Sequence, residues 1–317
     1  MAALIIPLGG GAGQAFASSP PKFDDGSSQA DVVDQIRLSP FRFERMTLPV
    51  SINSGPTLSF LIDTGAEVSG VTPEVARRYG FAQAGSRTVV GIAGREQVAT
   101  VRMSGLQFSR SRGADTDTDA LLFSRAAMGA DGYLGIDSLA DQRIEFDFAN
   151  QRMQLRRSSR FPMRSSERAV VVRAKAENGR LIFSSAQVNK TVVTVMLDTG
   201  STVTVGNAEL MRQLAAKGRL GETVPIEVLS VTGKMVSANY AILREVLIGD
   251  VLIRRLPVAF ATVEPFHHLG WDDRPALLLG MDALRAFAKV TVDFPHRAVK
   301  FTARNYDNEA TIGLGIW

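Results

Sequence analysis

An internal repeat constrains the fold of this chain more than any other feature. Asp-Thr-Gly occurs at residues 63–65 and again at residues 198–200, 135 positions later. A Gly-x-Asp element follows each triplet, at Gly135 and at Gly280, and these two elements are 145 positions apart. A nearly constant offset over several elements in the same order indicates a duplication. We therefore expect two lobes of similar plan.

Local patterns predict that both lobes are built mainly from strands. Short apolar runs at 60–62 and 193–197 lead into the two triplets, and residues 144–148 and 290–294 alternate between apolar and polar side chains. Alternation of this kind is typical of half-buried strands. We expect only short helices, at 73–79, at 208–217 and just after each Gly-x-Asp element; Thr72 and Pro73 fit the start of the first one. The prediction is an all-β fold of two pseudo-twofold-related lobes with a central cleft.

Composition suggests where the lobes begin and end. The chain is 45% hydrophobic and 21% charged, which argues against disorder of the whole chain. An Arg- and Ser-rich stretch with no hydrophobic period is typical of an exposed linker. We therefore expect a signal-like or disordered segment at 1–37, a first lobe at 38–155, a linker at 156–168 and a second lobe at 169–317. The apolar end at 310–317 is either a strand between the lobes or a disordered tail.

The N-terminal segment resembles the later part of a secretory signal peptide. Residues 2–8 form an apolar run, and Ala15, Phe16 and Ala17 give a small-x-small pattern before Ser18. No Lys or Arg precedes Lys22, so the basic part of a signal peptide is not present; either the true start lies upstream, or the segment is only a flexible tail. We expect a periplasmic or secreted protein. No apolar run reaches the ~18 residues that span a bilayer, so no stable membrane insertion is expected.

Asp63 and Asp198 are the candidate catalytic residues. If the two triplets face one another, these carboxylates lie within hydrogen-bonding distance, and two like charges so close cannot both stay ionised cheaply. The charged carboxylate can take a proton from a bound water while the neutral one donates to a carbonyl oxygen. Such a pair hydrolyses amides without a metal or a covalent intermediate, so no cofactor is expected.

The neighbouring Thr and Gly residues have supporting roles in this arrangement. The hydroxyls of Thr64 and Thr199 can donate across the axis to main-chain groups of the opposite loop. Gly65 and Gly200 allow the two loops to approach closely, because a side chain there would crowd the backbone.

The two copies differ directly after the triplet, where lobe 1 has Ala66 and lobe 2 has Ser201. A serine at this position can donate to the carboxylate and stabilise its charged form. We therefore expect Asp198 to ionise more readily, and Asp63 to hold the shared proton.

With these motifs the chain resembles the retropepsin-like branch of the aspartic proteases, in a two-lobed, single-chain form of bacterial type. The resemblance covers roughly residues 45–155 and 170–302. It implies that each lobe supplies one catalytic Asp, that the cleft takes an extended polypeptide, and that the protein is a monomer whose lobes form an intramolecular pseudo-dimer. It also implies a substrate-covering flap at Gly91, Ile92, Ala93 and Gly94, with a counterpart at Val231, Thr232 and Gly233. A pepsin-type flap Tyr is not evident. Two alternatives remain open for the flaps: both lobes have a mobile flap, or the flap of lobe 2 has become a fixed loop.

The sequence thus favours an aspartic endopeptidase, and the alternative is a catalytically inactive peptide-binding module of the same fold. With no cysteine, the chain has no disulfides, thiol catalysis or zinc–cysteine site. The net charge of +4 comes from scattered arginines without interleaved aromatics, so no nucleic acid is expected.

Two acidic segments resemble metal sites only weakly. The acidic run at 115–119 lacks the Gly and Glu of a calcium loop. The pairs at 267–268 and 272–273 lack a third ligand at helical spacing. No metal is expected at either place.

Overall fold

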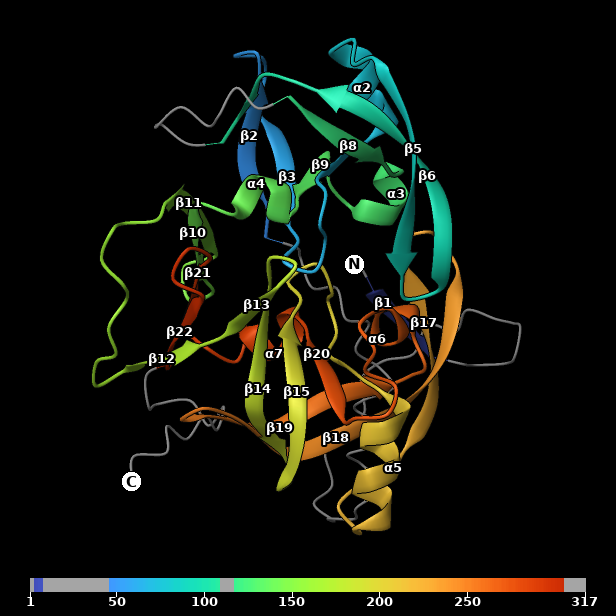
Figure 1. The fold of residues 1–317 in the computed structure, drawn as a ribbon, viewed down its shortest axis with the longest axis vertical. Coiled ribbons are helices and arrows are strands. Elements are labelled where there is room, and N and C mark those ends of the chain that lie inside the picture. The colour runs from blue at the N-terminus through green and yellow to red at the C-terminus, as the bar shows by residue number, and fades with distance from the viewer. Residues whose placement is uncertain (1–2, 8–45, 109–116, 305–317) are drawn as a thin grey trace, which may run out of the picture.

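The computed structural model describes residues 3–7, 46–108 and 117–304, and it places them in two strand-rich lobes joined by a third sheet (Figure 1). The remainder of the N-terminal segment, the C-terminal stretch 310–317 and the start of the acidic run at 115–119 lie outside these residues. None of the helices in the described ranges is long and apolar enough to cross a bilayer.

Lobe 1 is a curled sheet with three short helices. Its elements are β2 (Leu48–Ile52), β3 (Leu58–Ile62), β4 (Gly70–Val71), α2 (Pro73–Arg78), β5 (Gln83–Gly91), β6 (Gly94–Met103), β7 (Leu106–Gln107), β8 (Thr118–Leu122), α3 (Arg125–Met128), β9 (Gly132–Leu134) and α4 (Ile136–Leu139). The strands follow the order β5-β6-β8-β4-β9-β3-β2-β7.

Lobe 2 repeats this plan with longer strands. Its elements are β1 (Ala3–Pro7), β13 (Lys175–Glu177), β14 (Arg180–Val188), β15 (Thr191–Leu197), β16 (Val205–Gly206), α5 (Ala208–Ala216), β17 (Val224–Ser230), β18 (Met235–Ile248), β19 (Val251–Phe260), α6 (Glu264–His268), β20 (Ala276–Leu279) and α7 (Met281–Leu284). The order is β1-β17-β18-β19-β16-β20-β15-β14-β13. The β1 backbone, from the segment predicted as a leader, pairs antiparallel with β17.

The third sheet joins the lobes, because it takes strands from both. It contains β10 (Gln142–Asp147), β11 (Arg152–Arg157), β12 (Ala169–Arg173), β21 (Lys289–Asp293) and β22 (Ala298–Thr302), in the order β11-β10-β21-β22-β12. In β10 the alternation predicted from the sequence buries Ile144 and Phe146. These side chains belong to one apolar core that also holds Phe60 of lobe 1 and Leu197 of lobe 2.

Two cross-strand ion pairs connect β10 of lobe 1 with β21 of lobe 2, related by the pseudo-twofold axis. Arg143 lies opposite Asp293, and Asp147 lies opposite Lys289. Arg143 Nε donates to Asp293 Oδ2 at 2.8 Å, and Lys289 Nζ lies 2.8 Å from Asp147 Oδ2. Both lobes therefore contribute one cation and one carboxylate to the shared sheet.

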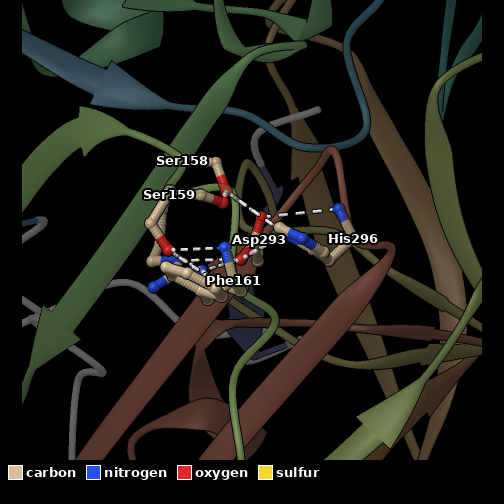
Figure 2. Close-up of polar contacts among 6 residues, drawn as sticks. Ser158, Ser159, Phe161, Asp293 and His296 are labelled. Atoms are coloured by element: carbon tan, nitrogen blue, oxygen red, sulfur yellow. Dashed lines mark hydrogen bonds and ion pairs between the residues drawn. The ribbon is translucent and has the colours of Figure 1, made fainter.

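The buried Asp293 also anchors the start of the linker (Figure 2). Ser158 Oγ donates to Asp293 Oδ1 at 2.7 Å, and His296 Nδ1 lies 3.1 Å from Asp293 Oδ2. Arg143 Nη2 donates to the carbonyl of Phe161 at 3.1 Å. Ser158 Oγ and His296 Nδ1 both bond to Asp293, so the serine and the carboxylate lie on the same side of the imidazole ring. In a Ser-His-Asp triad the carboxylate bonds to Nδ1 and the serine bonds to Nε2, on the opposite side of the ring. The cluster is therefore structural, although it contains all three residue types of a nucleophilic triad.

The longer predicted helices form, whereas two short ones are not evident in the sequence. Thr72 Oγ1 accepts from Val75 N at 3.2 Å at the start of α2, and Asn207 caps α5 in the same way. The helices α3 and α6 have four and five residues, too few for a helical period to be visible. Pro265, Gly270 and Trp271 predict a loop beside a strand for the segment that contains α6, and the structure shows that this prediction is wrong at residues 264–268.

Candidate active site

Each candidate catalytic Asp follows a strand that runs parallel to a second, buried strand. Leu61 pairs with Tyr133 between β3 and β9, and Met196 pairs with Leu278 between β15 and β20. Asp63 N donates to the carbonyl of Leu134 at 2.9 Å, and Asp198 N donates to that of Leu279 at 3.0 Å. The two acidic turns are therefore fixed by equivalent backbone bonds in the two lobes.

The Gly-x-Asp elements pass directly behind these turns. A Cβ at Gly135 would lie 2.8 Å from Val68 C, and a Cβ at Gly280 would lie 2.4 Å from Val203 O. Real side chains do not reach such distances from backbone atoms, so glycine is required at both positions. Asp282 accepts from the hydroxyl of Thr204 at 2.6 Å, and Asp137 accepts from that of Ser69 at 2.7 Å. Each crossing is thus held by a carboxylate–hydroxyl pair.

Thr64 and Thr199 link the two turns through a symmetric set of hydrogen bonds. Thr64 Oγ1 donates to the carbonyl of Leu197 and Thr199 Oγ1 donates to that of Ile62, both at 2.8 Å. The backbone N of each Thr donates to the hydroxyl of the other at 3.1 Å. All four groups are buried, so the relative position of the two Asp residues is tightly restricted.

The carboxylates of Asp63 and Asp198 lie against the opposite turns. A Cβ at Gly65 would lie 2.8 Å from Asp198 Oδ1, and a Cβ at Gly200 would lie 2.2 Å from Asp63 Cγ. The backbone N groups of Gly65 and Ala66 donate to Asp63 Oδ1 at 2.9 and 3.0 Å, and Gly200 N donates to Asp198 Oδ1 at 3.1 Å. The two side chains therefore face one another across the pseudo-twofold axis.

The surroundings of Asp198 favour its protonated form, whereas the sequence predicts that Asp63 holds the shared proton. Burial raises the pKa of Asp198 to about 6, and the nearby negative charge of Asp63 acts in the same direction. The hydroxyl of Ser201, expected to stabilise ionised Asp198, donates instead to the carbonyl of Val203 at 2.7 Å. The raised pKa of Asp198 and the direction of the Ser201 hydroxyl therefore argue against Asp63 as the holder of the shared proton. Burial favours the protonated form of Asp198.

A cavity of about 210 Å³ opens beside Asp63 on the lobe 1 side. Its apolar wall comes from β3, β5, β8, β9 and α3, and Glu67, Arg87, Arg180 and His268 add polar groups. The apolar wall residues include Leu61, Val89, Leu121, Phe123, Met128 and Tyr133. The arrangement gives one carboxylate of the pair direct access to a mostly apolar pocket.

The predicted flap residues form the tips of two hairpins. Ile92 and Ala93 make the turn between β5 and β6, where Gly91 pairs with Gly94. Val231, Thr232 and Gly233 lie in the turn between β17 and β18, and Thr232 N donates to Ser230 Oγ at 3.2 Å. Ile92 packs into an apolar cluster of lobe 2, and Val231 packs against one of lobe 1. The hairpins therefore cross over, each contacting the opposite lobe.

One pair of residues beside the dyad was not found from the sequence. Arg180 of lobe 2 is buried, its Nε donates to the carbonyl of Gly65 at 3.2 Å, and its Nη1 lies 2.9 Å from Glu67 Oε1. The residue of lobe 2 that corresponds to Glu67 is Thr202, so the repeat contains no symmetric counterpart of this ion pair. The available signal was Glu67 itself, an acidic residue two positions after the triplet.

The acidic segments considered as metal sites make other contacts. His267 Nδ1 lies 2.7 Å from Asp272 Oδ2, and Asp119 pairs with Arg87 and Arg102 at 3.3 and 3.2 Å. Within the described part of the chain, no group of three or more His, Asp or Glu side chains could hold a metal ion.

Comparisons with known proteins bear on the family of this chain. A crystal structure of a retropepsin-like aspartic protease from Rickettsia conorii is similar at 18% sequence identity and a TM-score of 0.31, covering 43% of this chain and 90% of that chain. No curated protein sequence matches. The family model described as aspartyl protease matches residues 48–138 and 184–283, which is more than half of the chain. Each matched range contains one Asp-Thr-Gly triplet, and the chain therefore belongs to the aspartyl protease family.

Proposed function

We propose that this protein is an aspartic endopeptidase that hydrolyses peptide bonds in extended polypeptides, with Asp63 and Asp198 as its catalytic pair. The observation that carries the proposal is the buried, reciprocal Thr64–Thr199 hydrogen bonding, which holds the two acidic turns face to face. Because one chain supplies both carboxylates, a monomer is sufficient for the reaction.

The chemistry follows from the unequal environments of the two carboxyl groups. Ionised Asp63 takes a proton from a water molecule, whose oxygen forms a bond to the carbonyl carbon of the substrate, while protonated Asp198 donates its proton to the carbonyl oxygen. In the resulting diol, Asp63 returns its proton to the amide nitrogen, the C–N bond breaks, and Asp198 recovers a proton from a diol hydroxyl. Both groups end as they began, so no cofactor is needed.

The cleft has a suitable place for the substrate backbone. The strand β5 is the edge of its sheet, and its residues 87–91 line the cavity beside Asp63. An extended peptide can pair with such a hairpin edge through main-chain hydrogen bonds. Polypeptide substrates are therefore favoured over small amides.

The test is hydrolysis of an unstructured protein such as casein, with and without a statine-type inhibitor. Wild type should cleave, and Asp63→Asn or Asp198→Asn should lower kcat by about a thousandfold or more. Because the two groups act as a unit, the double variant should lose little more than either single variant. Tight statine binding by wild type without any cleavage would reject the protease proposal in favour of a peptide-binding module.

We also propose that the protein is exported, on the signal-like pattern at residues 2–17. Cleavage near Ala17 would remove β1 from the edge of β17. The mass of the mature protein from the periplasm or medium should then match a chain that begins near Ser18. A cell-retained chain of full mass would contradict export.

A further inference from the structure

The two lobes share a plan, but the spaces beside the catalytic pair differ. In lobe 1, the side chains of Leu61, Val68 and Tyr133 border the open cavity of about 210 Å³. An apolar cavity of about 150 Å³ is enough to hold a benzene ring, so this one admits a large apolar side chain. The repeat places Met196, Val203 and Leu278 at the equivalent positions of lobe 2. These three residues are buried within an apolar cluster of lobe 2.

A longer loop in lobe 2 fills part of the space that corresponds to the lobe 1 cavity. Three residues connect α3 to β9 in lobe 1, whereas seven connect α6 to β20 in lobe 2. The longer connection contains Trp271, which is 1% exposed and packs in the same cluster as Met196 and Leu278. Asn207 Nδ2 donates to the carbonyl of Trp271 at 2.8 Å and fixes the loop.

The flap of lobe 1 fills the rest of this space in lobe 2. Ile92 at its tip is 5% exposed and packs into the lobe 2 cluster, alongside Val203 and Trp271. Figure 1 shows the β5–β6 hairpin reaching down from lobe 1 to the region of α6. Two ion pairs hold it there. Arg95 Nε lies 2.5 Å from Glu264 Oε1 of α6, and Glu96 Oε1 lies 2.6 Å from Lys234 Nζ beside the opposite flap.

We infer that the cleft selects large apolar side chains on one side of the scissile bond only, the side that faces lobe 1. On the lobe 2 side Ile92 and Trp271 occupy the equivalent space, so substrates carry a small side chain there. The inference rests on the proposed function, because it assigns the two halves of that same cleft. Trp271 is part of the core of lobe 2, whereas Ile92 lies at the tip of the β5–β6 hairpin. Truncation of Ile92 should therefore open the space on the lobe 2 side.

The test is a set of peptides in which the residue on either side of the cleaved bond is Ala or Phe. Wild type should prefer Phe on one side and Ala on the other. Val89→Phe, which fills the lobe 1 cavity, should reduce the preference for Phe and so identify the side that lobe 1 binds. Ile92→Ala should raise kcat/KM for Phe relative to Ala on the other side by about tenfold or more. Val192→Ala, an exposed change in β15 away from the cleft, should leave the profile unaltered.

A binding measurement separates this inference from the proposed function. Statine peptides with Ala or Phe on either side of the statine need only bind, and their affinity for wild type and for Ile92→Ala can be measured by titration calorimetry. One-sided binding without cleavage would reject the protease and keep the pocket assignment. Equal acceptance of Phe on both sides by wild type, or an Ile92→Ala profile identical to that of wild type, would overturn the assignment.

Discussion

Arg180 connects the two lobes at the level of a single side chain. It comes from β14 in lobe 2, yet it donates to the carbonyl of Gly65 and pairs with Glu67, both in the acidic turn of lobe 1. Since its guanidinium is buried, its bond to Gly65 is poorly screened by solvent, whereas Glu67 is half-exposed. We assign it a positioning role for the turn that carries Asp63.

Arg180→Met should lower kcat/KM by about 10- to 100-fold, because a hydrogen bond to a charged group contributes about 1.5–3 kcal/mol. Arg180→Lys keeps the charge but not the fork of donors, so it should restore part of the loss. Arg212→Met removes an exposed pair with Glu209 and should change kcat/KM little. Steady-state kinetics of the three variants decide the matter. Full activity of Arg180→Met would show that Arg180 does not position the turn that carries Asp63.

The raised pKa of Asp198 has a consequence for stability. An ordinary Asp has a pKa of 3.8, whereas folded Asp198 has a pKa of about 6, so the folded state binds more protons between these values. The contribution of this group to stability is therefore present below about pH 4 and is lost as pH rises through about 6.

Asp198→Asn, which cannot ionise, should therefore be more stable than wild type at pH 7.5, by up to about 3 kcal/mol. The difference should vanish near pH 4. Urea unfolding at both pH values measures it, and the exposed change Asp250→Asn serves as the control. A destabilised Asp198→Asn at pH 7.5 would show that the folded protein favours the charged form.

At the scale of elements, the shared sheet holds its two ion pairs in unequal surroundings. Asp293 is fully buried and is also bonded by Ser158 and His296, whereas Lys289 on the other pair is more exposed. Breaking a buried pair leaves a charge without its partner, while removing Lys289, whose charge reaches solvent, leaves Asp147 with two hydrogen bonds from Asn150 and should cost less.

Arg143→Met should thus destabilise the protein by about 3–5 kcal/mol. Lys289→Met should cost about 1 kcal/mol or less. Chemical denaturation of the two variants tests the contrast, and equal losses would show that the pairs are energetically equivalent despite their different burial.

The elements also show which features the sequence could predict. The acidic turns and the Gly-x-Asp crossings were recognisable because their geometry permits few residue types, as the crowding at Gly135 and Gly280 illustrates. The acceptor of the Ser201 hydroxyl could not be predicted, because a serine has several possible acceptors nearby and only the folded structure shows that it donates to the carbonyl of Val203. The helix α6 and the buried Trp271 were missed for a related reason. Their positions depend on packing against a distant flap and not on any local period.

At the scale of the whole molecule, the lobes depend on each other. The largest apolar core contains side chains from both lobes and from the sheet that joins them, and the Thr64–Thr199 bonds cross the same boundary. Each lobe alone would expose part of this core and leave those groups without partners.

The chain should therefore unfold in one cooperative transition although it has two lobes. Far-UV circular dichroism and the fluorescence of Trp271 should follow the same curve in urea. Two separated transitions would mean that the lobes are energetically independent, and would weaken the role assigned to the shared core.

The central claim is that Asp63 and Asp198 act as one unit on a single bound oxygen. A crystal structure of the protein with a statine peptide tests it most directly, because the statine hydroxyl takes the place of the attacking water. We predict that this hydroxyl lies within hydrogen-bonding distance of both carboxyl groups. A hydroxyl bound to only one of them, or a peptide bound away from the acidic turns, would contradict the account.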